Sequence, residues 1–172
     1  MDQLVITILG DDRAGLVDAL SGAISRHGGN WERSQMIELA GKFAGVVLVR
    51  IAPSNTDALR AELDQIEASG LLNIELEKAA VESDDTIKHR FDLEITGQDH
   101  PGIVYEVSHA LAQNNINIEE FSSEVVPAPM GGEMFKANAV VEAPESTELD
   151  DLQDIIEAVA TDLLVDIDPH QD

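Results

Sequence analysis

The chain opens with an alternating pattern that changes into a helical one. Apolar residues fill every second position from 4 to 8, which predicts a strand, and every third or fourth position from 16 to 24, which predicts a helix. Gly28-Gly29 ends that helix, because glycine accepts the left-handed conformation found at helix C-termini. The next predicted elements are two strands at about 30–40 and 42–52, joined tightly at Ala40-Gly41, a helix around 59–66 and a last strand around 72–76.

The same patterns return in the second half of the chain. Residues 3–35 align without a gap with residues 90–122, with 9 identical pairs where chance gives about two. The identical pairs include Gly10/Gly97, Asp12/Asp99, Gly15/Gly102, Asn30/Asn117 and Glu32/Glu119. We therefore predict two similar units at 1–80 and 88–169. They are joined by a linker at 81–87 that contains the polar run Glu-Ser-Asp-Asp.

Each unit has the element order βαββαβ. With right-handed crossovers, this order folds as a four-stranded antiparallel sheet with both helices on one face. The predicted fold class is therefore α+β, with two ferredoxin-like units. A unit of about 80 residues is near the lower limit for an independent core, so we expect the two units, or two chains, to pack together.

The turn after the first strand of each unit is the strongest candidate for a binding site. Asp12 and Asp99 stand where a helix N-cap is expected, and Pro101 suits the first helical turn. The glycines of this turn allow close approach to the backbone, whose free N–H groups attract an anion such as an amino-acid carboxylate. A capped turn without a ligand explains the same residues equally well, since duplicating a fold also duplicates its caps.

Asn30 and Asn117 open the second strand of each unit, which we expect to neighbour that turn. An asparagine amide both donates and accepts hydrogen bonds, so each suits a small polar ligand. The alternative is a turn position with a positive φ angle. His100 stands beside the second turn, where it is either a ligand contact or an exposed loop residue.

Composition excludes several classes of function. The chain has 10 Lys+Arg against 34 Asp+Glu, for a formal net charge of -24, which opposes direct binding to nucleic acid or to an anionic membrane. It has no Cys, and no histidine pair has the HxxxH or HExxH spacing of a zinc site. No nucleophile-and-base set or phosphate-binding loop occurs, so we expect no metal, no cofactor and no enzyme activity. With no signal sequence or membrane span, a cytoplasmic protein is expected.

The motif DHPGIV at 99–104, followed by NNINIEEF at 114–121, resembles the ACT domain. The tandem arrangement is similar to that of the glycine cleavage system transcriptional repressor family. That resemblance implies a small amino acid, with glycine suggested, as ligand and a transcription activator as protein partner. It also implies ligand sites, often at an interface between domains, made by Asp12, Arg13, Ala14, Gly15 and Asn30, and by Asp99, His100, Pro101, Gly102 and Asn117. The first copy departs from the pattern at Arg13-Ala14. The alternatives are a regulatory subunit of an amino-acid biosynthetic enzyme and an interaction module without a ligand.

The two predicted sheets differ on the face away from the helices. In the first unit this face carries Val5, Thr7 and Leu9, whereas the second unit has Asp92, Glu94 and Thr96 at the equivalent positions. The run at 46–49 is apolar on both sides of its strand. An exposed apolar patch marks an interaction surface. We therefore expect the first face to be covered by the second unit, a second chain in a homodimer or a partner protein, and the second face to stay solvated.

Overall fold

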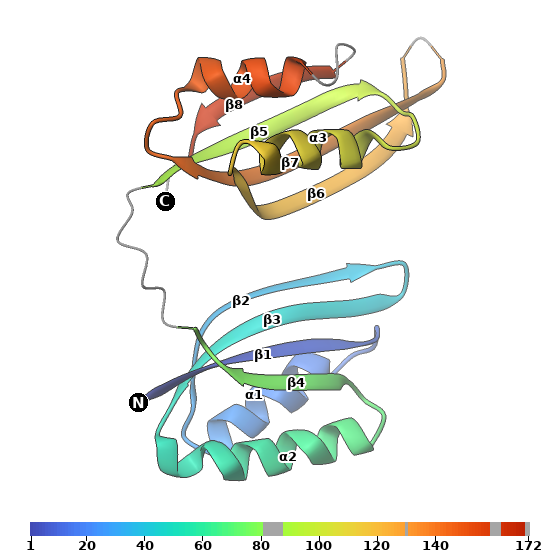
Figure 1. Cartoon of the computed structure of the whole chain (residues 1–172). Helices are drawn as coiled ribbons and strands as arrows, with labels where there is room; N and C mark the ends of the chain where they lie inside the picture. Colours follow the sequence, from blue (N-terminus) through green and yellow to red (C-terminus); the bar gives the residue numbers. More distant parts are fainter. Residues whose placement is uncertain (81–87, 130, 159–162, 171–172) are drawn as a thin grey trace. The chain divides into compact units, whose positions relative to one another are not determined.

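The computed structural model of the protein describes residues 1–80, 88–129, 131–158 and 163–170 (Figure 1). The chain divides into two compact units, Met1–Ser83 and Asp84–Asp172. The division falls within the predicted linker at 81–87, which lies outside the described residues. The prediction of an α+β chain with two βαββαβ units is confirmed.

Both units have the same strand order. The first contains β1 (Asp2–Asp11), α1 (Leu16–Arg26), β2 (Asn30–Leu39), β3 (Lys42–Ile51), η1 (Pro53–Asn55), α2 (Thr56–Ala68) and β4 (Asn73–Lys78). The second contains β5 (Lys88–Gln98), α3 (Ile103–Gln113), β6 (Asn117–Pro127), β7 (Glu133–Pro144), α4 (Leu149–Glu157) and β8 (Leu163–Pro169). The sheet orders are β2-β3-β1-β4, called sheet 1, and β6-β7-β5-β8, called sheet 2. All the pairings within them are antiparallel.

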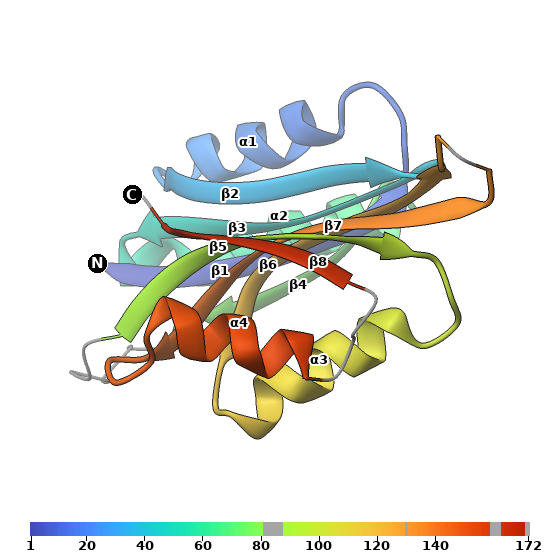
Figure 2. The ribbon, with the colours of Figure 1, turned by 90° about the horizontal axis from the view of Figure 1, so that it is seen from above.

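The core of each unit lies between its sheet and its two helices. Alternate residues of the central strand face the helices, and Leu4, Ile6 and Ile8 of β1 are all buried. In the second unit, α3 and α4 lie side by side over one face of sheet 2 (Figure 2). Phe91, Leu93 and Ile95 of β5 are buried there against them. Within the described ranges, no helix is long and apolar enough to cross a membrane.

The turns predicted from glycine and asparagine are found in the structure. Gly28 and Asn115 follow the first helix of their units with φ angles of 67° and 57°, which is the left-handed conformation expected there. The hairpin between β2 and β3 has a two-residue loop in which Ala40 has φ 51° and Gly41 has φ 78°. Two positive φ angles define a type I′ turn, which matches the twist of the flanking strands but disfavours alanine.

We expect the Ala40→Asn substitution to stabilise the first unit. Asparagine tolerates a positive φ that costs free energy for alanine, so the free energy of unfolding should rise by about 0.5–1 kcal/mol. The shift in the urea midpoint measures this gain. Ala40→Ser is a suitable control because serine, like alanine, is disfavoured at the positive φ of this position. An equal midpoint for both variants would contradict the assignment of strain to the turn.

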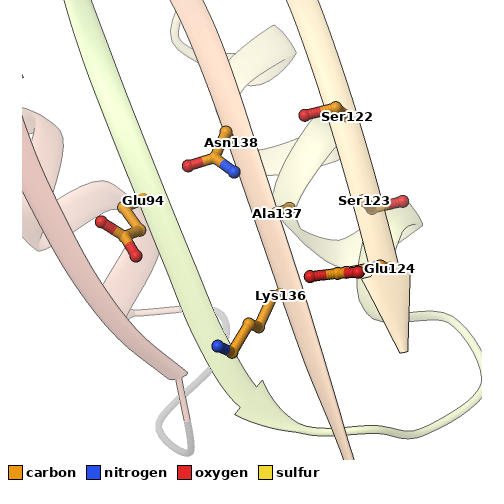
Figure 3. Close-up of a pocket in the computed structure, with 7 residues that line it drawn as sticks. All are labelled: Glu94, Ser122, Ser123, Glu124, Lys136, Ala137 and Asn138. Carbon is orange, nitrogen blue, oxygen red and sulfur yellow. The ribbon is translucent and has the colours of Figure 1, made fainter. Parts of the chain in front are cut away.

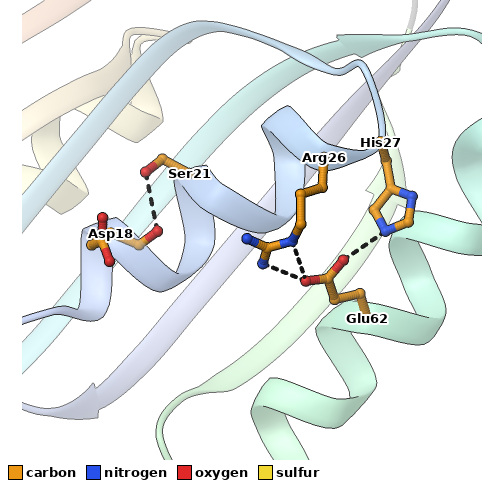
Figure 4. Close-up of polar contacts among 5 residues, drawn as sticks. All are labelled: Asp18, Ser21, Arg26, His27 and Glu62. Atoms are coloured by element: carbon orange, nitrogen blue, oxygen red, sulfur yellow. Dashed lines mark hydrogen bonds and ion pairs between the residues drawn. The ribbon is translucent and has the colours of Figure 1, made fainter.

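A polar cluster connects the two helices of the first unit on their outer side (Figure 4). Arg26, at the end of α1, forms an ion pair with Glu62 of α2, and its Nε lies 2.9 Å from Glu62 Oε1. His27 Nε2 lies 2.7 Å from Glu62 Oε2. The hydrogen bond from Arg26 holds the pKa of the Glu62 carboxyl below its ordinary value. Burial opposes this shift, and the bond from His27 adds to it.

The lowered pKa of Glu62 makes a pH-dependent contribution to stability. A carboxyl whose pKa is lower in the folded chain stabilises the fold above its unfolded pKa of about 4.3. That contribution is lost as the pH falls through the folded value. Glu62→Gln should therefore lower the melting temperature at pH 7, and the difference from the parent should shrink below about pH 4. Asp64→Asn, at an exposed position in the same helix, removes a carboxylate outside this cluster and serves as the control. A difference that stays constant with pH would contradict the role of this cluster.

Candidate functional site

The turn that joins the first strand to the first helix has the same conformation in both units. Gly15 immediately precedes α1 with φ 98°, and Gly102 immediately precedes α3 with φ 103°. Only glycine adopts this region readily, so each glycine is required by the backbone. Asp12 N–H donates to Gly41 O at 2.9 Å, and Asp99 N–H donates to Glu133 O at 3.1 Å. Each turn is therefore fixed to the β-hairpin of its own unit.

The prediction that Asp12 and Asp99 are helix N-caps is wrong. The N-cap position is held by Gly15 and Gly102, and no side-chain hydrogen bond caps either helix. Pro101 precedes the helix instead of lying in its first turn, because α3 begins at Ile103. The left-handed glycine moves each helix start beyond the aspartate. The first N–H groups of a helix have no intrahelical partner, so an anion can bind them here without displacing a side chain.

The side chains around the two turns differ. In the first unit, Arg13 Nη2 donates to Gly70 O at 2.9 Å, so its guanidinium is engaged by the loop after α2. In the second unit, His100 Nε2 lies 3.8 Å from Glu106 Oε2. A Cβ at position 102 would lie 3.8 Å from Glu106 Oε1. Glu106 was not among the candidates from sequence, although its position four residues after Gly102 places it on the first turn of α3.

The structure does not bring Asn30 and Asn117 to these turns. Asn30 is opposite Arg50, which is opposite Gln3, whereas the turn follows Asp11 at the other end of β1. The distance along the strand from Gln3 to Asp11 is about 26 Å. Asn117 lies equally far from its turn, opposite Glu142 and hence near Arg90. The sequence-based expectation fails because β1 and β2 run parallel to each other. Both strands therefore begin at the same end of the sheet, and the turn lies at the opposite end.

The alternative explanation for the two asparagines also fails. The non-glycine residues with positive φ in the described chain are Ala40 and Asn115, so neither Asn30 nor Asn117 needs that conformation. Both asparagines are exposed at the start of an edge strand. A ligand that touches the turn of one unit can therefore reach such an asparagine only if another ACT-like unit supplies it.

Among the described residues, no group of three or more His, Asp or Glu is arranged to hold a metal ion. Two of the histidines have carboxylate partners within 3 Å. His27 contacts Glu62, and His170 Nδ1 lies 2.7 Å from Asp92 Oδ1. The second contact, together with the bond from His170 N–H to Arg90 O, fastens the end of β8 to β5. These contacts give both side chains a structural role.

A polar hollow of about 450 Å³ lies on the face of sheet 2 away from the helices (Figure 3). Three neighbouring strands line it, through Glu94 of β5, Ser122, Ser123 and Glu124 of β6, and Lys136, Ala137 and Asn138 of β7. Sequence reasoning assigned this face to solvent but did not find the hollow. The hollow depends on the strand register, which places Ser122 opposite Asn138 and Asn138 opposite Glu94.

Comparison with known families agrees with the fold and the turns. ACT domain profiles match residues 2–82 and residues 91–157, so the two units are ACT domains and the chain belongs to the ACT domain family. ACT domains and this architecture are typical of regulatory proteins that respond to amino acids, which bears out the regulatory class expected from the sequence. No curated protein matches the chain.

Among the solved structures similar to the chain, two have a TM-score above 0.7 and cover nearly its whole length. A protein of unknown function from Galdieria sulphuraria has 27% sequence identity and a TM-score of 0.86, with 99% of both chains covered. A candidate glycine cleavage system transcriptional repressor has 18% identity and a TM-score of 0.71, with 98% of both chains covered. At that identity, the second match shows a shared fold alone.

Proposed function

We propose that this protein is a non-catalytic regulator that binds a small amino acid at its second ACT domain and controls transcription through a protein partner. The family resemblance suggests glycine as the ligand, and a candidate glycine cleavage repressor shares the fold of this chain. The observation that carries the proposal is the start of α3, where Gly102 holds the N-cap position and no side-chain hydrogen bond caps the helix. The N–H groups of such a first turn are the ones that an anion binds.

The contrast between the two turns supports binding at the second domain. In the first domain, the Arg13 side chain donates a hydrogen bond to Gly70 O, so its guanidinium already has a partner within the chain. In the second domain, His100 and Glu106 lie beside the glycine and are both exposed or half-exposed. An imidazole, a carboxylate and free N–H groups offer partners for both ends of an amino-acid zwitterion.

The family resemblance implies a ligand site at an interface between domains, and Asn117 could contribute only to a site of that kind. Within one domain this residue lies at the far end of the sheet from the turn. If the same ligand contacts both, the asparagine belongs to a neighbouring domain. A ligand held in this way links two domains and changes how firmly they associate, which gives a means of passing the signal to a partner.

The charge of the chain supports action through a protein and not on DNA. The first 86 residues contain 7 Lys+Arg and 15 Asp+Glu, and the last 86 contain 3 and 19. Neither half offers the basic surface that counterion release requires. A repressor of this composition would act by binding a transcription activator. A regulatory subunit of an amino-acid biosynthetic enzyme, and an interaction module without a ligand, are the alternative functions.

We predict that the Gly102→Val substitution removes amino-acid binding. The parent should bind glycine, or another of the twenty amino acids in a thermal-shift screen, with a Kd of roughly micromolar to millimolar. A branched side chain at φ 103° strains the turn and crowds the exposed N–H groups. Isothermal titration calorimetry of the folded variant measures the loss.

The control for this prediction is Gly15→Val, which places the same strain at φ 98° in the first domain. It should retain binding. If either valine variant fails to fold, the pair Gly102→Ala and Gly15→Ala provides the same comparison with less strain. Equal binding by both members of a folded pair would refute a site at the second turn. No binding by the parent would favour the interaction module.

A second prediction concerns the partner. Purified protein should give no gel shift with duplex DNA at low salt, because a chain of net charge -24 repels phosphate. Affinity purification from the native cell should recover a DNA-binding regulator. Recovery of a biosynthetic enzyme would favour the regulatory-subunit function, and a clear shift with DNA would overturn action through a partner.

A further inference from the structure

The face of sheet 1 away from the helices carries a continuous apolar surface, called here the free face of sheet 1. Register places Val46 and Leu48 of β3 beside Val5, Thr7 and Leu9 of β1 on this face. Leu9 and Val46 are each 49% exposed, and Ile37 and Leu39 of β2 are 58% and 71% exposed. Val47 and Val49, from the same run, point to the helices and are fully buried.

The equivalent face of sheet 2 shows that the fold does not require apolar residues here. Its exposed or half-exposed positions are mostly polar or charged, and they include Asp92, Glu94, Glu120, Glu124, Lys136, Asn138, Asp166 and Asp168. The two sheets share one topology and descend from one repeat, so folding alone explains neither pattern. The apolar character of the first face is a property of that surface, and an apolar patch of this kind marks an interface.

Charges lie at the two edges of the free face of sheet 1 and have opposite signs. Arg33 is on edge strand β2, while Glu75 and Glu77 are on edge strand β4, all on this face. One row across the sheet reads Arg33, Leu48, Val5 and Glu77. Arg33, Glu75 and Glu77 are exposed, and none of them has an ion-pair partner among the described residues.

We infer that the free face of sheet 1 binds the same face of a second copy of this chain, about a two-fold axis parallel to the strands. Such an axis reverses the strand order, so that β2 faces β4 of the partner subunit and β3 faces β1 of the partner subunit. The row Arg33, Leu48, Val5 and Glu77 then faces the same row of the partner subunit in the reverse order. Leu48 lies over Val5 of the partner subunit, and Arg33 lies over Glu77 of the partner subunit.

This arrangement satisfies both the charges and the geometry of sheet packing. Aligned sheets pack about 10 Å apart with their strands rotated by about 30°. Near the axis the rotation leaves the apolar rows in contact. At the edge strands, the rotation shifts one sheet along the other by about half the distance between residues i and i+2. Arg33 therefore faces Glu77 or Glu75 of the partner subunit, because both glutamates lie on the same strand and the same face. Each contact occurs twice.

The area of the face is sufficient for a stable dimer. β1, β2 and β3 have 10 residues each and β4 has 6, so the four strands give a face of about 600 Å². Two such faces bury about 1,200 Å² in total, which exceeds the roughly 1,000 Å² expected of a biological interface. The apolar centre and the charged edges also follow the usual order of an interface, with a dry core and a polar rim.

Charge reversal with mixing tests this dimer. Arg33→Glu creates like charges at both edges of a homodimer, and so does the double variant Glu75→Arg, Glu77→Arg. Each should weaken dimerisation about tenfold or more in sedimentation equilibrium. In a 1:1 mixture of the two variants, opposite charges face each other again at both edges, so dimerisation should return. A contact within one chain cannot be restored by mixing.

Sheet 2 provides matched controls. Asp166→Arg, Asp168→Arg makes the same change at the equivalent edge strand of its free face, and Lys136→Glu reverses one positive charge there. Both controls should dimerise like the parent. Circular dichroism confirms that each variant is folded. A monomeric parent at all soluble concentrations, parental dimerisation by both reversed variants, or a mixture that remains dissociated would each overturn the inference.

Discussion

A four-stranded sheet with two helices has two faces and only enough helix to cover one of them. This constraint decides most of what each unit of this chain looks like. The residues of β1 and β5 that face the helices must be apolar, and Leu4, Ile6 and Ile8 have the same role as Phe91, Leu93 and Ile95. The other face is free to evolve, and there the two units have different chemistry. The centre of one free face carries mainly valine and leucine, whereas the other carries mainly aspartate and glutamate, with Val140 and Leu164 among them.

The fold could be predicted because its signals are local and occur twice. Alternation at residues 4–8, helical spacing at 16–24 and the left-handed residues Gly28 and Asn115 each report on a few neighbours in sequence. Two aligned copies remove much of the ambiguity of a single pattern. The orientation of the run at 46–49 was not predictable, because all its residues are apolar and only pairing shows that Val47 faces the core.

The candidate site was predicted less well, for two physical reasons. An aspartate three residues before a glycine is a common helix start, but here the left-handed Gly102 takes the N-cap position and leaves Asp99 outside the helix. Asn117 follows the end of α3 closely in sequence. However, α3 returns the chain from the turn to the end of the sheet where β5 begins, and Asn117 lies there. The asparagine was expected beside the turn because it is near in sequence, but in the structure it lies about one strand length away. Glu106 was overlooked because an acidic residue in a first helical turn needs no ligand to explain it.

The distribution of charge also explains why association would be confined to one surface. A chain with net charge -24 repels its own copies, and 7 of its 10 basic residues lie in the first unit. At physiological salt this repulsion is screened beyond about 8 Å, so it acts mainly between charges that approach closely. The carboxylates on the free face of sheet 2 would therefore repel the same face of a second copy. The free face of sheet 1 has an uncharged centre and keeps its opposite charges at separate edges, where a two-fold axis brings them together. The same fold thus carries one face suited to a second copy and another whose carboxylates favour contact with water.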